Sequence, residues 1–177
     1  MAIFDIVTYG NPVLRKEAAE VTDIDDEIRR IINDVEETLS QQNGIGLAAT
    51  QIGISKKILS IDLTKSKGDK KISLINPVII TRSKDEVEYE EGCLSVPEVW
   101  GNVSRPRTIK IKGTLKSGKT LIIEAEDLFA RVLQHEIDHL EGKLFIDYLS
   151  QTEKEKYKEK INSIIEKNKV ILGKVCL

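Results

Sequence analysis

The sequence has only two cysteines, only two histidines, no long apolar run and almost no net charge, and these shortages exclude several classes of protein. Cys93 and Cys176 are too few for a disulfide framework. The longest apolar runs, such as residues 121–123, are far shorter than the roughly 20 residues that a membrane-spanning helix needs. Residues 1–5 lack the basic and apolar regions of a secretory signal, so we expect a cytoplasmic protein that does not enter a membrane.

The charges of the chain are nearly balanced, with 27 Lys and Arg against 29 Asp and Glu and a formal net charge of -2. This balance leaves no positive surface for phosphates, so we do not expect specific nucleic-acid binding. Hydrophobic residues make up 40% of the 177 residues, which is enough for a packed core and excludes a disordered chain. Because the chain has no internal repeat and no linker-like segment, its length predicts one domain.

Two amphipathic helices are visible in the spacing of the apolar residues. Spacings of three and four predict a helix from Ile24 to Leu39, with Asp23 as its N-cap. The same spacing predicts a helix from Leu128 to Leu140, which ends near Gly142 and is apolar enough to lie in the core.

A capping box formed by Thr152 and Glu155 predicts that a third, C-terminal helix begins there. Between the first two helices, turn residues at 67–69 and 116–119 separate segments that are β-branched or alternate in hydropathy. These segments are the predicted strands, over residues 57–63, 71–80, 85–90, 107–113 and 120–125. Their short connections favour antiparallel pairing, and the order of elements predicts an α+β fold.

The most informative motif lies inside the second predicted helix, where the chain reads His135-Glu136-Ile137-Asp138-His139. Four residues are slightly more than one helical turn, so both imidazoles project from one face and can bind one metal ion. Glu136 lies beside them and can take a proton from water at the ion. The sequence therefore predicts antiparallel β-sheets packed around a central metal-binding helix, with an N-terminal and a C-terminal helix.

A catalytic site of this type has three protein ligands, so a third must come from elsewhere in the chain. Phe145 stands where one class of zinc peptidases has its third histidine, which excludes that class. Three glutamates of the last predicted helix lie at plausible separations, namely Glu153, Glu155 and Glu159. That helix is rich in Lys and Glu, however, which is typical of a solvated face.

Cys93 is the other candidate for the third ligand. Gly92 before it lets a backbone or a ligand approach closely, and Pro97 after it is expected to stop the strand from continuing. We therefore expect Cys93 at the end of a strand, near backbone donors. The alternative is that Cys93 is a small buried side chain with no chemical role. Because the two-histidine site lacks a ligand, metal binding by Cys93 is favoured.

Small residues dominate the segment 44–53, which follows the first predicted helix. Its glycines resemble a phosphate loop, but no Lys-Ser or Lys-Thr follows and the segment leaves a helix instead of a strand. We interpret it as backbone that passes close to a ligand, with Gln51 able to donate a hydrogen bond.

Three segments together resemble the signature motifs of the peptide deformylases, in the order of that family: Gly44–Gln51, Glu91–Ser95 and Gln134–Gly142. The opening residues 6–15 are also similar to the start of the family, and the resemblance extends over nearly the whole chain. It implies a single peptide deformylase domain over residues 1–177, of the bacterial subtype that ends in a helix.

By this resemblance, Cys93, His135 and His139 bind one divalent metal ion. The ion is Fe2+ in most bacterial members, and Zn2+, Ni2+ or Co2+ can occupy the same site. Selectivity depends more on geometry and metal availability than on ligand identity.

The resemblance also implies the reaction and the catalytic residues. Glu136 is the general base, while the Gln51 side chain and the Leu94 backbone N–H stabilise the developing oxyanion. The reaction removes the N-formyl group from the N-terminal methionine of newly synthesised polypeptides and releases formate.

The same resemblance places the formylated peptide as an extra strand against Ile45, Gly46 and Gly92. Its methionine side chain would enter an apolar pocket that includes Val132 and Leu94, although ordinary core packing explains these two side chains equally well.

The chain departs from the family pattern at two places. Residues 10–11 read Gly-Asn where many members have Pro-Asp, and Trp100 at the rim of the substrate site stands where many have Arg or Tyr.

The Lys-rich segment 152–169 offers a surface for ribosome contact, but a solvated helix face is the simpler interpretation. We expect a monomer, in which Cys176 is structurally incidental.

Two other functions are alternatives to this one. A zinc endopeptidase would use Glu136 in the same role with a downstream glutamate as ligand, and would keep its metal and activity if Cys93 were replaced by serine. A structural metal site in a ribosome- or protein-binding module would have four protein ligands and no exchangeable water.

Overall fold

The computed structural model describes residues 3–66 and 68–175, and side chains as far as residue 169. Cys176 and Lys67 of the predicted turn at 67–69 lie outside the described residues. Within the described residues the strands form two sheets, and neighbouring strands pair antiparallel as the sequence predicts. None of the described helices is long and apolar enough to cross a membrane.

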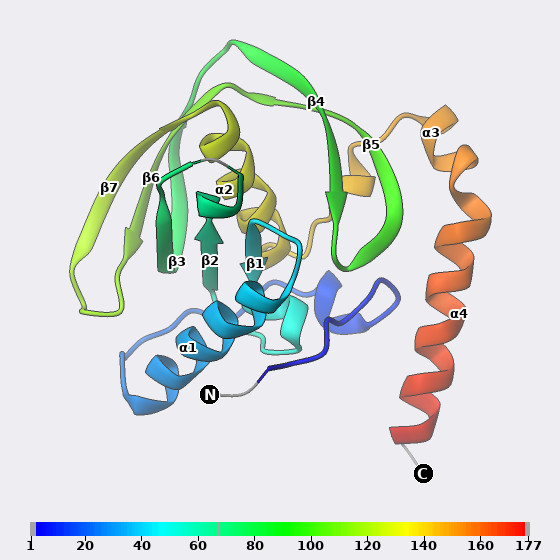
Figure 1. Cartoon of the computed structure of the whole chain (residues 1–177), viewed down its shortest axis with the longest axis horizontal. Coiled ribbons are helices and arrows are strands. Elements are labelled where there is room, and N and C mark those ends of the chain that lie inside the picture. Colours follow the sequence, from blue (N-terminus) through cyan, green and yellow to red (C-terminus); the bar gives the residue numbers. More distant parts are fainter. Residues whose placement is uncertain (1–2, 67, 176–177) are drawn as a thin grey trace.

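The larger sheet has the strand order β1-β2-β3-β6-β7 (Figure 1). Its strands are β1 (Gly46–Ala48), β2 (Ile58–Asp62), β3 (Lys71–Arg82), β6 (Thr108–Thr114) and β7 (Thr120–Glu126). The smaller sheet is a hairpin of β4 (Glu86–Cys93) and β5 (Val96–Pro106). Short 3-10 helices complete the framework, at η1 (Pro12–Arg15), η2 (Ala49–Ile52), η3 (Leu63–Ser66) and η4 (Phe145–Asp147).

Helix α2 (Asp127–Leu140) lies between the larger sheet and the β4-β5 hairpin (Figure 1). Its apolar residues join one buried cluster with side chains of β2, β3 and β6, which include Leu59, Leu74 and Ile111. The prediction of a core helix over 128–140 is confirmed. Because the apolar face of α2 is committed to the larger sheet, its other face is available to the hairpin and to the site between them.

Helix α1 (Asp26–Gln41) packs against β1 and β2 through the buried stripe Ile28, Ile31, Ile32, Val35 and Leu39. The predicted N-cap Asp23 is wrong by two residues, since the Asp25 side chain accepts a hydrogen bond from the Ile28 N–H at 2.9 Å. Asp25 can do so because its own backbone is extended while the following residues are already helical.

Strand β5 is absent from the sequence-based prediction, and the expectation that Pro97 stops the strand is wrong. Strand β4 does end at Cys93, as predicted, but Pro97 is the second residue of β5. Cys93 pairs with Val96 whereas Gly92 pairs with Trp100, so residues 97–99 bulge out of the ladder. A proline is tolerated in a bulge because no ladder hydrogen bond requires its missing N–H.

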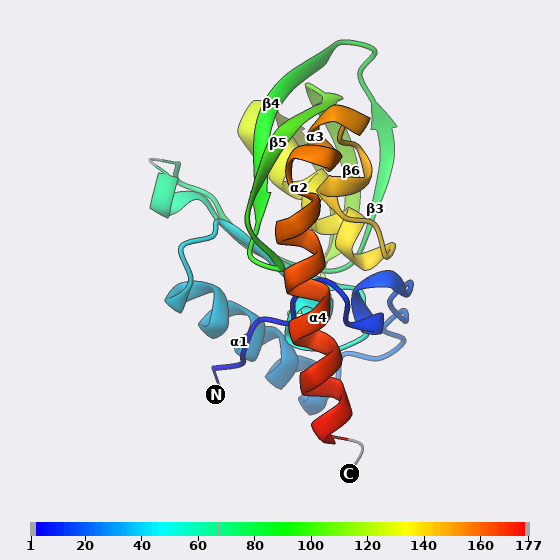
Figure 2. The same ribbon diagram turned by 90° about the vertical axis from the view of Figure 1, so that its right-hand side faces the viewer.

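The C-terminal helix begins with a capping box of Ser150 and Glu153, so the predicted box of Thr152 and Glu155 is wrong. The Ser150 Oγ accepts from the Glu153 N–H, and the Glu153 carboxylate accepts from the Ser150 N–H at 3.1 Å. The helix is also divided into α3 (Gln151–Lys156) and α4 (Lys158–Val175). Figure 2, which looks onto the right-hand side of the view in Figure 1, shows α4 running down the front of the view, before the N-terminal segment.

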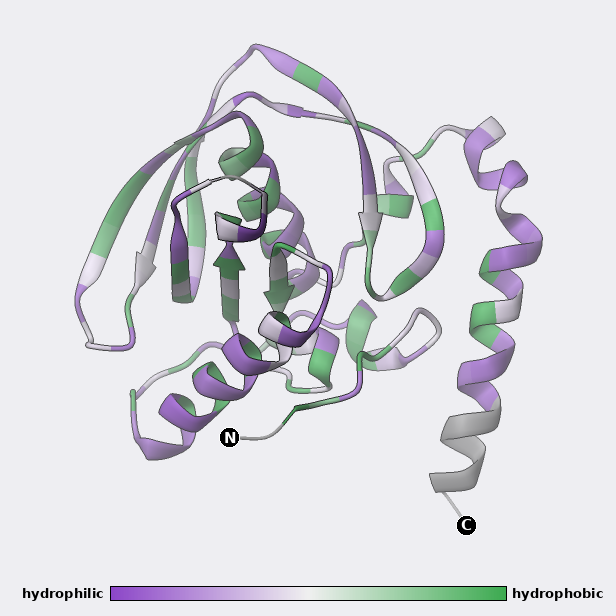
Figure 3. Ribbon diagram, viewed as in Figure 1, coloured by the Kyte–Doolittle hydropathy of each residue, from purple (hydrophilic) through white to green (hydrophobic). Residues whose placement is uncertain are grey.

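Hydropathy follows this arrangement. Figure 3 shows β1 and β2 as mainly hydrophobic, and α1 and residues 158–169 of α4 as mainly hydrophilic. Over their described side chains, the two outer helices therefore bury one stripe each and expose the rest, whereas β2 beside α2 is buried on both sides.

The packing of α2 can be tested at Leu133, which is fully buried in the cluster with the larger sheet. Leu133→Ala should lower the free energy of unfolding by about 2–5 kcal/mol because it removes buried methyl groups and leaves a cavity. Leu128→Ala is the matched control, since Leu128 lies on the same helix and is 45% exposed. Urea unfolding of both variants measures the difference, and equal losses would contradict the proposed core position of Leu133.

Candidate metal centre and active site

Three potential metal ligands from two elements converge at one point. Cys93 is the last residue of β4, while His135 and His139 lie one turn apart on α2. One ligand atom from each lies within 4.8 Å of the others, and the Cys93 Sγ is 3.1 Å from the His139 Nε2. A thiolate and two imidazoles are a donor set that suits Zn2+ or Fe2+, and three protein ligands are typical of catalytic sites.

The surroundings of the two histidines suit a bound cation. Burial lowers the pKa of His139, which keeps its imidazole neutral as a metal ligand must be. Burial acts in the same direction on His135, but hydrogen bonds with Cys93 and Glu91 outweigh it and raise the pKa of His135. Positive charge is thus favoured beside Cys93, and a divalent ion would supply that charge.

Glu91 orients His135 from behind, because its Oε2 is 2.9 Å from the His135 Nδ1. The carboxylate also accepts hydrogen bonds from Arg105 at 2.6 and 3.0 Å and from Arg131 at 2.6 Å. Burial raises the pKa of Glu91, but the bonds from His135 and Arg105 prevail and lower it to about 2. Arg105 in turn reaches Asp138 on α2 at 2.7 Å, so buried ion pairs join the hairpin to the helix.

The sequence motifs predict no individual role for Glu91, Arg105 or Arg131. One signal for Arg105 is present in the sequence, because Val99, Gly101 and Val103 occupy alternate positions that continue to Arg105 on the same buried face. A charged residue at a buried position of a strand needs a partner of opposite charge. No comparable local pattern singles out Glu91.

Glu136 is 3% exposed, and its Oε2 has no hydrogen-bond partner among the described residues. Burial raises its pKa to about 7, with a further contribution from the negative charge of Glu91. A Cβ placed on Gly46 would collide with the Glu136 carboxylate, so only glycine lets β1 pass this close. Glu136 therefore combines a pKa suited to proton transfer with free hydrogen-bonding capacity.

The backbone three residues earlier fixes the Gln51 side chain, because the Gln51 Oε1 accepts a hydrogen bond from the Ala48 N–H at 2.8 Å. This bond directs the Nε2 towards the Cys93 Sγ at 3.5 Å and the Ser95 Oγ at 3.3 Å. Leu94 follows Cys93 in the turn between β4 and β5, so its backbone belongs to the same corner of the site.

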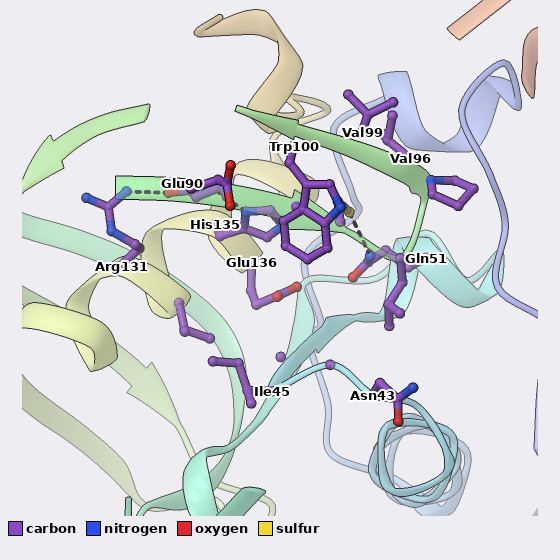
Figure 4. A pocket seen from close by; sticks show the side chains of 18 of the residues that line it. Asn43, Ile45, Gln51, Glu90, Val96, Val99, Trp100, Arg131, His135 and Glu136 are labelled. Atoms are coloured by element: carbon purple, nitrogen blue, oxygen red, sulfur yellow. Dashed lines mark hydrogen bonds and ion pairs between the residues drawn. The ribbon is translucent and has the colours of Figure 1, made fainter. Parts of the chain in front are cut away.

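A cavity of roughly 540 Å³ lies between β1, the hairpin and α2, and its lining includes Cys93, His135 and Glu136 (Figure 4). Every residue that the sequence associates with substrate lines it, namely Ile45, Gly46, Gln51, Gly92, Leu94 and Val132. Trp100, which is 54% exposed, covers Gly92, where an added Cβ would lie 2.5 Å from the indole ring. His139 is buried behind this cavity at 1% exposure.

The structure contradicts the alternative in which a downstream glutamate is the third ligand. Glu153 accepts a hydrogen bond from the Asn102 N–H on the outside of the hairpin, and Glu155 pairs with Lys158. Glu153, Glu155 and Glu159 are not among the residues that gather at His135 and His139 in the described part of the chain. Cys93 occupies that place instead.

A family model for polypeptide deformylase matches residues 3–155. The chain belongs to the polypeptide deformylase family. The resemblance found in the three sequence segments is thereby confirmed, and so is the α+β fold that it implies.

Individual relatives agree with this assignment over almost the whole chain. A peptide deformylase of Alkalilimnicola ehrlichii is 40% identical over 173 residues, which cover 98% of this chain and 97% of the relative. The crystal structure of a peptide deformylase from Legionella pneumophila has a TM-score of 0.86 and 38% identity, with 94% of this chain and 98% of that chain covered. A peptide deformylase structure from Plasmodium falciparum gives a TM-score of 0.88 at 35% identity, with 94% of this chain and 98% of that chain covered.

Glu91→Gln tests the buried ion pairs that support His135. The change leaves Arg105 and Arg131 without their shared negative partner, and we expect the free energy of unfolding to fall by about 3–5 kcal/mol. Denaturant unfolding of the protein measures this loss. Glu90→Gln makes the same chemical change at the exposed neighbouring residue and should alter stability by less than about 0.5 kcal/mol; a comparable loss there would argue against the role of the buried network.

Proposed function

We propose that this chain is a metal-dependent hydrolase that removes the N-formyl group from the N-terminal methionine of newly synthesised polypeptides and releases formate. The observation that carries the proposal is the convergence of Cys93, His135 and His139 beside the buried Glu136. Cys93, His135 and Glu136 line one cavity, and His139 is buried behind it. Membership of the deformylase family supports the substrate.

In our proposal Cys93, His135 and His139 hold a single divalent ion, which is Fe2+, with Zn2+, Ni2+ or Co2+ as substitutes. The ion supplies Lewis acidity, which makes water a better nucleophile and polarises the formyl carbonyl group. Glu91 keeps the His135 ring in place through its Nδ1, as carboxylates behind metal-bound histidines commonly do.

Glu136 is the proposed general base and then the general acid. Its carboxylate takes the proton from the attacking water and returns it to the departing amine nitrogen, so that the free N-terminus can leave. A pKa of about 7 suits both steps, because the group can accept and release a proton near neutral pH.

Gln51 and the backbone N–H of Leu94 are the proposed donors to the formyl oxygen as it gains negative charge. The Ala48 N–H fixes the amide of Gln51 with its Nε2 towards the site, so little reorganisation is required during the reaction.

The proposed substrate path lies between two strand edges that face each other across the cavity. β1 is the outermost strand of the larger sheet, and β4 pairs only with β5 in the described strand order. An extended peptide could pair with the backbone near Ile45, Gly46 and Gly92, and its methionine side chain could lie against Val132.

Several expectations from the sequence remain predictions. They are a single domain over residues 1–177, a monomeric state, a cytoplasmic location and ribosome contact through the Lys-rich segment 152–169.

Glu136→Ala tests the base. The purified wild-type protein should release formate from a formyl-methionyl peptide with about one metal ion per chain, and the variant should lose at least about 100-fold in rate while keeping its metal. Glu88→Ala, at an exposed position of β4 outside the cavity, should leave the rate unchanged. No formate release by the metal-loaded wild type would overturn the proposed function.

Cys93→Ser tests the ligand set. We expect loss of bound metal and of formate release together, because a neutral hydroxyl replaces a thiolate in a three-ligand site. Cys176→Ser removes the other cysteine and should change neither, as measured by metal analysis and the same assay. Retention of metal and activity in Cys93→Ser would show that the third ligand lies elsewhere.

A further inference from the structure

Helix α4 lies outside the segment that the family model matches, yet it buries a polar side chain against the N-terminal segment. Asn168 is 4% exposed although most of the polar residues of α4 face solvent. A buried amide on an otherwise hydrophilic helix must find hydrogen-bond partners, and here all but one of them are on residues 8–9.

The Asn168 Nδ2 lies 2.8 Å from the Tyr9 carbonyl oxygen, and 2.6 Å and 3.1 Å from the Thr8 Oγ1 and carbonyl oxygen. Gly10 permits this close approach, because a Cβ at that position would be 3.1 Å from the Ile165 Cα and the backbone has φ +104°. The glycine at residue 10 is thus explained by the docking of α4.

The segment that Asn168 holds is bonded directly to two segments of the active site. The Tyr9 N–H donates to the Ser95 carbonyl oxygen at 2.7 Å, and the Val7 N–H donates to the Gln51 carbonyl oxygen at 2.8 Å. Residues 7–9 therefore tie the turn after Cys93 to the short helix that carries Gln51.

Ser95 completes the connection to the proposed ligand. Its backbone N–H donates to the Cys93 Sγ at 3.4 Å, and its Oγ accepts from the Gln51 Nε2 at 3.3 Å. A displacement of residues 8–9 would shift Ser95, and with it two of the hydrogen-bond donors that surround the sulfur.

We propose that Asn168 is a positioning residue for the metal centre: through Thr8 and Tyr9 it fixes the Ser95 and Gln51 donors around the Cys93 sulfur. The inference rests on the proposed function in one respect, namely that Cys93 is a metal ligand. It gives the C-terminal helix a task within the active site, besides any contribution to stability.

The test uses the full chain loaded with Co2+, whose absorption includes a thiolate-to-cobalt band when a cysteine is bound. Asn168→Asp keeps the shape of the side chain but places a carboxylate against the carbonyl oxygens of Thr8 and Tyr9. We expect a shifted cobalt band and metal release to a chelator about 10-fold faster, the lower end of the range for partners of metal ligands. We also expect a lower kcat with an unchanged KM.

Asn162→Asp is the matched control, because it makes the same change at an exposed position of α4. A cobalt band and release rate equal to those of this control would overturn the inference, even if Asn168→Asp melted at a lower temperature. If Asn168→Asp does not fold, Asn168→Ala decides by the same criteria, since it removes the donor without adding charge. Absence of the thiolate band in the wild type would instead contradict the proposed ligand set.

Discussion

The buried carboxylate of Glu91 is the interaction on which the active site depends. It lies on β4 and binds Arg105 of β5 together with Arg131 and His135 of α2, so one side chain joins three elements. Such a group is costly to bury unless every charge has a partner, and here each of the four has one. This requirement places the hairpin in one position relative to α2, which brings Cys93 at the end of β4 to the two histidines.

The groups that would perform chemistry contrast with this satisfied network. Glu136 and His139 are buried, and each keeps an atom without a hydrogen-bond partner among the described residues. Unpartnered buried polar atoms are unfavourable for stability. Besides His139 Nδ1 and Glu37 Oε2 on α1, the described residues include Glu136 Oε2, whose carboxylate belongs to a residue that lines the cavity. Ion pairs thus support His135 from behind, whereas the Glu136 carboxylate keeps hydrogen-bonding capacity for a molecule in the cavity.

The two ends of the chain contribute to the same corner. Residues 7–9 bond to the segments that contain Gln51 and Ser95, and Asn168 of α4 bonds to residues 8–9. The conformation around the Cys93 sulfur therefore depends on contacts that are 160 residues apart in sequence. Hydrogen bonds thus connect residues 7–9 and Asn168 to the site, although none of these residues lines the cavity.

The sequence by itself determined the features that depend on near neighbours. The helix with His135, Glu136 and His139 follows from apolar spacing and from the four-residue interval, and most strands follow from alternation. Cys93 as the strand-end partner of that helix follows from the missing third ligand and from the motif resemblance, and the structure brings it there. The tertiary structure alone decided that Pro97 lies in a bulge of β5 and that Asp25 and Ser150 cap their helices. It alone paired Glu91 with Arg105 and Asn168 with Tyr9, because such contacts depend on strand register and helix docking over long separations, which no local pattern encodes.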